Sequence, residues 1–439
     1  MSKYIIAGLA SVAVIGSFLA YDRIFSDEPR MEAAILLPVE EPLAEGASLQ
    51  KTPEELFQEA LERSANAKGV YMTGAVANDQ GRPATNLRSS LVALLDTTEL
   101  NAVVIDVKEV KGSEVTKNLQ PFVEELQKKG VWTIARITTF RDDSQTKTHP
   151  EYYLKRVNGA IWKDNRGGMW LDPASEGART YLIDFAKSII DIGFDELQFD
   201  YVRFPSDGDV RSIVFPAHDP KTPKYVTLKS FFEYANAELK RHKPDIILSA
   251  DLFGYVATNN NDLGIGQRIE DIGNNFDYVS FMIYPSHYYS GFQMPADPAR
   301  GLPAIYYPYR GKNVSQLVSN QPYDVIHRSM LYAGDVLAGR VATSSMASVN
   351  KKATTTPPVS AVASTSPMGG EPFVATPISR ARLRPWLQDF DLGADTARGI
   401  YYDAKKVRAQ IDAAEAAGTL GWLLWNPGNV YTKEALKVE

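Results

Sequence analysis

Short apolar runs alternate with longer amphipathic stretches through most of this chain, from residue 69 to residue 425. Short apolar runs predict buried strands, and longer stretches of helical period predict helices packed beside them. Strands are therefore expected at residues 69–75, 102–107, 131–137, 196–205, 246–253, 278–284, 383–389 and 421–425. Helices are expected at residues 87–97, 119–129, 176–192, 228–242, 265–276, 314–337 and 404–417.

The regular alternation of strand and helix predicts an α/β fold with a parallel sheet. Eight such units indicate a (β/α)8 TIM barrel with insertions, extending over residues 52–439. A doubly wound open sheet is the structural competitor. That fold usually has a glycine-rich phosphate-binding turn after its first strand, and residues 69–75 are not followed by one.

The first fifty residues have a different pattern. Residues 4–21 form an apolar run without a charged side chain, preceded by Lys3. This length is at the lower limit for a membrane-spanning helix, and it is long for a cleaved signal peptide. We therefore expect a signal anchor or signal peptide over residues 1–25 and a flexible linker rich in Pro, Glu and Ala over residues 26–51. The expected location is the cell membrane, single-pass, with the barrel outside the cytoplasm, or secreted if the segment is cleaved.

A second low-complexity stretch interrupts the barrel pattern. Ser, Thr, Ala and Pro dominate residues 341–379, which carry few large apolar side chains. Such a composition cannot bury a core, so we expect a disordered insertion in the barrel. A true linker between domains is the alternative, although the remaining C-terminal residues are few for an independent domain.

Composition excludes several classes of function. The net charge of −6 and the isoelectric point near 5.6 give no reason to expect a nucleic-acid partner. Cysteine is absent, which excludes disulfides, thiolate metal sites and a cysteine nucleophile. No HExxH pattern, P-loop or GxSxG elbow occurs. No cofactor or metal is expected, although residues 207–209 could hold calcium if they do not form a simple turn.

Polar side chains are concentrated at the ends of the expected strands. In a parallel barrel these ends meet at one mouth, where an unpaired charge would be costly without a functional reason. Aromatic side chains accompany them, and these suit a sugar, which has apolar faces ringed by hydroxyls. The candidate substrate-binding residues are Asp106, Lys108, Arg136, Trp170, Tyr201, Arg203, Tyr284, His287, Tyr288, Trp386, Gln388, Trp425 and Asn426.

Carboxyl groups at the same mouth are candidates for acid–base chemistry. Cleavage of a glycosidic bond normally requires two of them, one protonated and one ionised. Asp200 and Asp251 end adjacent strands, so they are the first pair to consider. Asp389 and Asp106 are further acids within reach of the same mouth.

Four segments carry a resemblance to a known family. Residues 199–205, 284–288, 384–390 and 421–426 resemble the bacterial family of putative glycoside hydrolases, placed near the α-amylase superfamily, and the resemblance covers residues 69–432. It implies a TIM barrel with a nucleophile after strand four, an acid/base after strand five and a supporting aspartate after strand seven. These roles fall on Asp200, Asp251 and Asp389. The chain differs from the amylase pattern in having Asp251 where Glu is usual and in lacking the histidine motifs.

The expected function is a glycoside hydrolase acting on a cell-envelope or extracellular polysaccharide. Arg203, Asp106 and Lys108 would position the substrate or tune the acids. Two alternatives stay open: a carbohydrate-binding barrel without turnover, and an envelope scaffold that binds proteins through the barrel. The scaffold would need apolar patches at the mouth in place of acids.

Overall fold

Eight parallel strands form a closed barrel in the computed structural model, which describes residues 51–259, 261–341 and 381–438. The barrel strands are β1 (Lys68–Met72), β2 (Ala102–Glu109), β4 (Trp132–Thr138), β5 (Glu196–Asp200), β6 (Ile247–Phe253), β7 (Tyr278–Ile283), β11 (Trp386–Gln388) and β12 (Trp422–Trp425). They follow one another in sequence order, and β12 pairs with β1. The closed barrel confirms the predicted parallel α/β architecture and excludes the open sheet.

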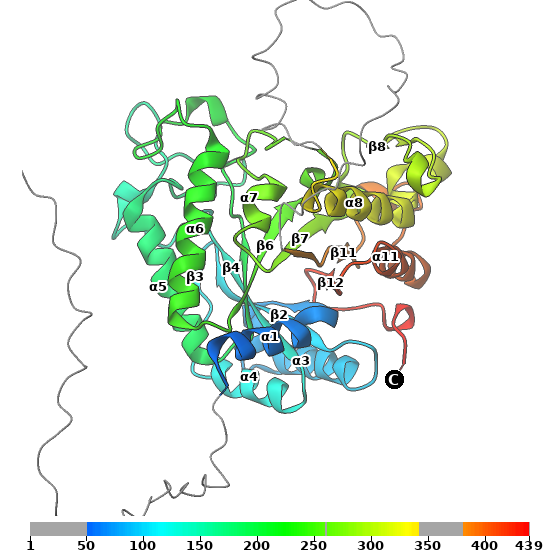
Figure 1. The fold of residues 1–439 in the computed structure, drawn as a ribbon, viewed down its shortest axis with the longest axis horizontal. Helices are drawn as coiled ribbons and strands as arrows, with labels where there is room; N and C mark the ends of the chain where they lie inside the picture. The colour runs from blue at the N-terminus through cyan, green and yellow to red at the C-terminus, as the bar shows by residue number, and fades with distance from the viewer. Residues whose placement is uncertain (1–50, 260, 342–380, 439) are drawn as a thin grey trace, which may run out of the picture. The chain divides into compact units, whose positions relative to one another are not determined.

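Helices surround the barrel between the strands (Figure 1). They are α3 (Arg82–Leu95), α4 (Leu119–Lys128), α5 (Glu176–Ile192), α6 (Lys224–His242), α7 (Ile269–Gly273), α8 (Pro322–Leu337) and α11 (Ala404–Ala416), with the shorter α2 (Gly74–Asn78) and α10 (Gly393–Thr396) in loops. Helix α5 ends at Gly193, whose φ of 109° lies in the left-handed region that glycine adopts without strain. Smaller strands also occur: β3 (Gly112–Ser113) extends β2, and β8 (Phe292–Met294) pairs with β9 (Ile305–Tyr307).

Several predicted elements differ from the structure, including the strand expected at residues 196–205, which ends at Asp200 as β5. The helix expected at residues 314–337 begins only at Pro322, where proline fits the first helical turn, and short 3-10 turns precede it. The helix expected at residues 265–276 is confined to α7. The strand expected at residues 383–389 is divided into β10 (Arg382–Leu383) and β11, because Pro385 cannot donate a ladder hydrogen bond.

Alternation along the strands determines which side chains reach the barrel interior. Ile134 and Ile247 belong to an interior cluster that is separate from the core between strands and helices. Successive strand residues face opposite sides, so Arg136 and Asp251, at even spacings from these two, point inward as well. The interior cluster consists of Ala67, Tyr71, Ala102, Val104, Trp132, Ile134, Ile247, Tyr278, Trp386 and Leu423.

An N-terminal helix covers the end of the barrel at which the strands begin. Helix α1 (Pro53–Arg63) starts with the predicted cap at Thr52, where Thr52 and Glu55 form a reciprocal capping box. Phe57 and Leu61 of this helix pack against the interior cluster. The amino-terminal end of the barrel is therefore filled, and access to its interior comes from the mouth at the carboxyl ends of the strands.

The predictions for the N-terminal segment, the linker and the low-complexity insertion fall on residues 1–50 and 342–380, outside the described residues. In the part of the chain that is described, none of the helices combines the length and the apolar character needed to cross a bilayer.

Candidate active site

Arg136 connects the acids at the mouth of the barrel. Its Nη1 donates to Asp106 Oδ1 at 2.5 Å and to Glu109 Oε1 at 2.8 Å. Its Nε donates to Asp200 Oδ2 at 3.1 Å and lies 3.8 Å from Asp251 Oδ2. A single buried guanidinium therefore compensates several carboxyl groups that could not otherwise be buried together.

Asp200 is the last residue of β5, and its backbone surroundings fix its orientation. Tyr201 follows with a φ of 51°, which is unusual for a residue with a bulky side chain. The carbonyl groups of Asp200 and Tyr201 accept from the N–H groups of Thr139 and Phe140, and Asp200 Oδ1 accepts from the Tyr201 N–H. Strain of this kind is found where the surrounding structure holds a functional side chain in place. Asp200 therefore accepts hydrogen bonds at both of its carboxyl oxygens, from Arg136 and from the Tyr201 N–H.

Asp251 has a different environment on the adjacent strand. Its Oδ1 accepts from Trp386 Nε1 at 2.8 Å, whereas its Oδ2 has no hydrogen-bond partner among the described residues. Burial raises the pKa of Asp251 well above its usual range, and the nearby Asp200 raises it further. The two neighbouring carboxyl groups thus differ in their hydrogen bonding, since Asp200 accepts at both oxygens and Asp251 at one.

Burial raises the pKa of Asp106 to about 7, while the positive charge of Arg136 opposes this shift. Tyr71 donates a hydrogen bond to the Asp106 carboxylate. Asp106 thus belongs to the layer beneath the cavity, where it orients Arg136.

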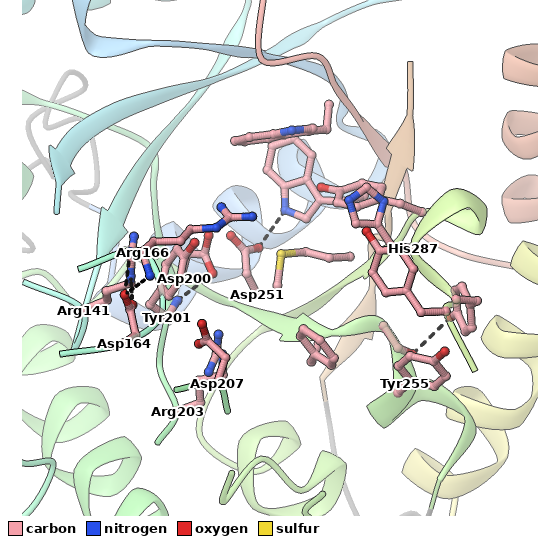
Figure 2. Close-up of a pocket in the computed structure, with 18 of the residues that line it drawn as sticks. Arg141, Asp164, Arg166, Asp200, Tyr201, Arg203, Asp207, Asp251, Tyr255 and His287 are labelled. Atoms are coloured by element: carbon pink, nitrogen blue, oxygen red, sulfur yellow. Dashed lines mark hydrogen bonds and ion pairs between the residues drawn. The ribbon is translucent and has the colours of Figure 1, made fainter. Parts of the chain in front are cut away.

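Asp200 and Asp251 line a cavity of about 440 Å³ at the mouth. Figure 2 shows Asp251 near its middle, with Arg141 and Arg203 on one side and His287 and Tyr255 on the other. The cavity thus has a charged wall and an aromatic wall, with the carboxyl pair at its base. Eleven of the sixteen residues predicted for the site line it: Arg136, Trp170, Asp200, Tyr201, Arg203, Asp251, Tyr284, His287, Tyr288, Trp386 and Trp425.

The expectation that every strand-end polar group faces this cavity needs correction. Lys108 is fully buried and pairs with Asp142 at 2.7 Å, because the register of β2 against β4 shifts between Asp106 and Lys108. Asp389 accepts from the N–H and hydroxyl of Thr432 at 2.9 and 2.7 Å, so its carboxylate holds the C-terminal segment.

Two other predicted residues also hold loops together and do not line the cavity. Gln388 accepts from Ser286 and donates to the Phe390 carbonyl. Asn426 donates to the carbonyl of Asp389 and accepts from Gly428. Asp106 likewise does not line the cavity.

Several cavity residues were not predicted from the sequence. Arg141, Asp164 and Arg166 come from the long loop after β4, which folds back over the mouth through bridges such as Arg141–Trp170. Asp164 accepts from Arg141 Nε at 2.7 Å and from Trp170 Nε1 at 3.1 Å. No periodicity marks this loop, so only its Trp170 gave a signal in the sequence. The other unpredicted lining residues are Asp207, Phe253, Gly254, Tyr255, Met282 and Tyr289.

Removing the Arg136 charge is expected to destabilise the protein. Arg136→Met leaves Asp106, Glu109 and Asp200 without their shared cation, which should lower the free energy of unfolding by about 3–5 kcal/mol. Denaturant unfolding measures this loss, with the exposed Arg156→Met as the matched control. Arg136→Lys should lie between the control and Arg136→Met. A loss below about 1 kcal/mol for Arg136→Met, within the range of exposed ion pairs, would contradict the role given to Arg136.

A closed parallel barrel with two neighbouring carboxyl groups in unlike environments at its carboxyl-end mouth is an arrangement typical of glycosidases. The chain belongs to the family described as the putative glycosyl hydrolase domain, whose model matches residues 69–431. This membership confirms the resemblance found in the sequence and supports the assignment as a glycosidase. No curated protein matches the chain.

Solved structures with related folds include known glycosidase domains. The PgaB (BpsB) glycoside hydrolase domain from Bordetella bronchiseptica aligns over 83% of this chain and 95% of its own, with a TM-score of 0.51 and 10% identity. A hypothetical protein from Ruminiclostridium thermocellum is 29% identical over 42% of this chain and 96% of its own, with a TM-score of 0.36. An α-galactosidase from Thermus thermophilus in complex with stachyose is 12% identical over 87% of this chain and 67% of its own, with a TM-score of 0.43. At 10% identity, the first likeness concerns the fold alone.

Proposed function

We propose that the protein is a retaining glycoside hydrolase with Asp200 as nucleophile and Asp251 as general acid and base. The observation that carries this proposal is the pair of carboxyl groups with unlike hydrogen-bond environments on one cavity, both within 4 Å of Arg136. Such a pair divides glycosidic cleavage into protonation of the leaving oxygen and attack on the anomeric carbon.

The spacing of the two groups supports retention of configuration. Asp200 Oδ2 and Asp251 Oδ2 lie 3.1 and 3.8 Å from the same nitrogen of Arg136. Atoms at these distances from one centre are less than about 7 Å apart, whereas carboxyl groups are about 5–5.5 Å apart in retaining and about 6.5–9.5 Å apart in inverting glycosidases. This bound on the two Oδ2 atoms is compatible with the retaining arrangement and supports it over the longer separations of inverting enzymes.

Hydrogen bonding supports the two proposed roles. Trp386 donates to Asp251 Oδ1, so the proton of the acid form resides on Oδ2, the oxygen without a hydrogen-bond partner among the described residues. Asp251 gives this proton to the leaving oxygen while Asp200 forms a bond to the anomeric carbon. The Asp251 carboxylate then removes a proton from the water that cleaves the glycosyl–Asp200 bond.

The aromatic wall supports a carbohydrate substrate. Trp425 and Trp386 lie edge to face with ring centroids 5.6 Å apart, and both line the cavity with Tyr284 and Tyr255. Their faces suit the apolar C–H surfaces of sugar rings. We propose a cell-envelope or extracellular polysaccharide as the substrate, with the apolar run at residues 4–21 as the membrane attachment.

Incubating the full chain with purified polysaccharides tests this function. We expect new reducing ends from at least one glycan, and proton NMR of the first product should show the anomeric configuration of the substrate. Glycan binding without release of reducing ends would favour the carbohydrate-binding barrel. An inverted first product would contradict the assignment of Asp200 as nucleophile.

A further inference from the structure

Arg203 is a nearly buried cation at the charged wall of the cavity, and the mechanism above gives it no task. Its side chain is only 8% exposed, yet it lines the cavity. The guanidinium lies 5.0 Å from the Trp170 ring, 5.5 Å from the Tyr201 ring and 5.8 Å from the Phe253 ring. Three aromatic neighbours hold its plane in a defined orientation, which is the preorganisation that recognition of an anion requires.

No carboxylate of the described residues forms an ion pair with Arg203. Its Nη1 donates to the Phe204 carbonyl at 3.0 Å and to Ser206 Oγ at 3.1 Å, and its other nitrogens have no partner in the described chain. Asp200 and then Asp207 act on Arg203 electrostatically, but neither lies within ion-pair distance of it. Burying an arginine without a counter-ion is costly, so this arrangement points to an anion supplied from outside.

The neighbouring charged side chains also leave an excess of positive charge on this wall of the cavity. Of the other two arginines at the charged wall, Arg141 is already neutralised by Asp164 at 2.7 Å. Arg166 is exposed, lines the cavity and forms no ion pair within the described residues. Figure 2 shows Arg166 and Arg203 on the same side of Asp251. Two uncompensated cations therefore lie on one wall, beside a single unpaired acid, Asp207.

We propose that the substrate is an anionic glycan and that Arg203 binds an acidic substituent of the sugar chain. This inference rests on the proposed function and names the substrate class. A carboxylate, as in a uronic acid, offers two oxygens in the plane of the guanidinium fork, and a sulfate ester offers the same paired oxygens. The substituent would lie against the Arg203 guanidinium at the charged wall, away from the aromatic wall that accepts the sugar faces.

Matched oligosaccharides that differ only in the charged group test this assignment on the full chain. One pair is an oligogalacturonate and its carboxyl-reduced form, a second is a hyaluronan oligosaccharide and its carboxyl-reduced form, and a third is a sulfated oligosaccharide and its desulfated form. Calorimetry on Asp200→Asn, which binds without turnover, should show at least one acidic member binding about 10- to 100-fold more tightly than its neutral partner. The pair that shows this preference identifies the anion. Equal affinity within all three pairs, including no detectable binding, overturns the proposal.

Variants of Arg203 test whether this residue causes the preference for the acidic oligosaccharide. In the Asp200→Asn background, Arg203→Gln should remove the preference for the acidic member, and Arg203→Lys should retain part of it because charge remains without the fork. Arg211→Gln is the matched control, because Arg211 is exposed in the following 3-10 turn and does not line the cavity. Thermal unfolding of each variant verifies folding. A folded Arg203→Gln or Arg203→Lys with an undiminished preference would contradict the assignment.

Incubating the same oligosaccharide pairs with the wild-type chain separates this proposal from the hydrolase proposal. Hydrolysis of neutral glycans without preference for an acid would refute the anion site alone. Tight binding of an acidic glycan without hydrolysis would refute the hydrolase and retain the anion site.

Discussion

Asp200→Asn is expected to lower glycan hydrolysis by a factor on the order of 10⁴, with KM nearly unchanged. The amide cannot form the glycosyl bond, so the first chemical step loses its nucleophile. The single asparagine oxygen can accept from Arg136 or from the Tyr201 N–H but not from both, so thermal unfolding should verify that the variant folds. Steady-state kinetics on the glycan identified by the polysaccharide screen measures the effect.

The control for this substitution is Asp209→Asn. Asp209 is exposed on the loop that follows β5 and does not line the cavity. Its activity should equal that of the wild type. If Asp200→Asn retains more than a tenth of wild-type kcat, Asp200 is not the nucleophile.

Asp251→Asn should produce the second largest loss of activity, and the size of this loss should depend on the leaving group of the substrate. Loss of a general acid lowers kcat by about 10²- to 10⁴-fold when the leaving group is another sugar. An aryl glycoside with an acidic phenol as leaving group needs little protonation, so bond cleavage on that substrate should be much less affected. Asp251→Glu restores a proton donor at a shifted position and should recover part of the activity. Equal losses of kcat/KM, which reports bond cleavage and not the later hydrolysis of the intermediate, on both kinds of substrate would contradict the acid role.

The pH profile provides an independent readout for Asp251. Activity requires the protonated acid, and burial followed by the charge of Asp200 raises the pKa of Asp251 well above the usual carboxyl range. Activity should therefore persist above that range and fall as the pH rises through the raised pKa. In Asp251→Asn this fall at high pH should disappear from kcat/KM.

Stability should depend on pH through the same group. The folded state holds the Asp251 proton more tightly than the unfolded state, so stability is lost as the pH rises through the folded-state pKa. Asp251→Asn should reduce this loss in thermal unfolding.

The barrel could be predicted from sequence because its signal is local and repeated. Alternation along the strands places Arg136 and Asp251 in the interior. The carboxyl ends of the strands meet at the mouth independently of the loop conformations. Residues beyond the last ladder position follow the loop instead. Asp389 and Asn426 therefore bond to loop groups and not to the cavity, although their positions in sequence are similar to that of Asp200.

Most residues of the charged wall could not be predicted from the sequence. Arg141, Asp164 and Arg166 lie on a long loop without periodicity, and its path depends on isolated bridges and on the hydrogen bond between Trp170 and Asp164. Arg203 was found because it lies just after β5, but its lack of an ion-pair partner depends on spacing that only coordinates provide.

Trapping the covalent intermediate tests the account most directly. A 2-deoxy-2-fluoro glycoside with a good leaving group, matched to the glycan that the enzyme cleaves, should react with the wild type. Mass spectrometry of the digested protein should then show one added glycosyl unit on the peptide that contains Asp200, and none in Asp200→Asn. A glycosyl unit on any other carboxyl group, or hydrolysis with inversion and no trapped species, would contradict the assignment of Asp200 and Asp251 as a nucleophile and acid pair.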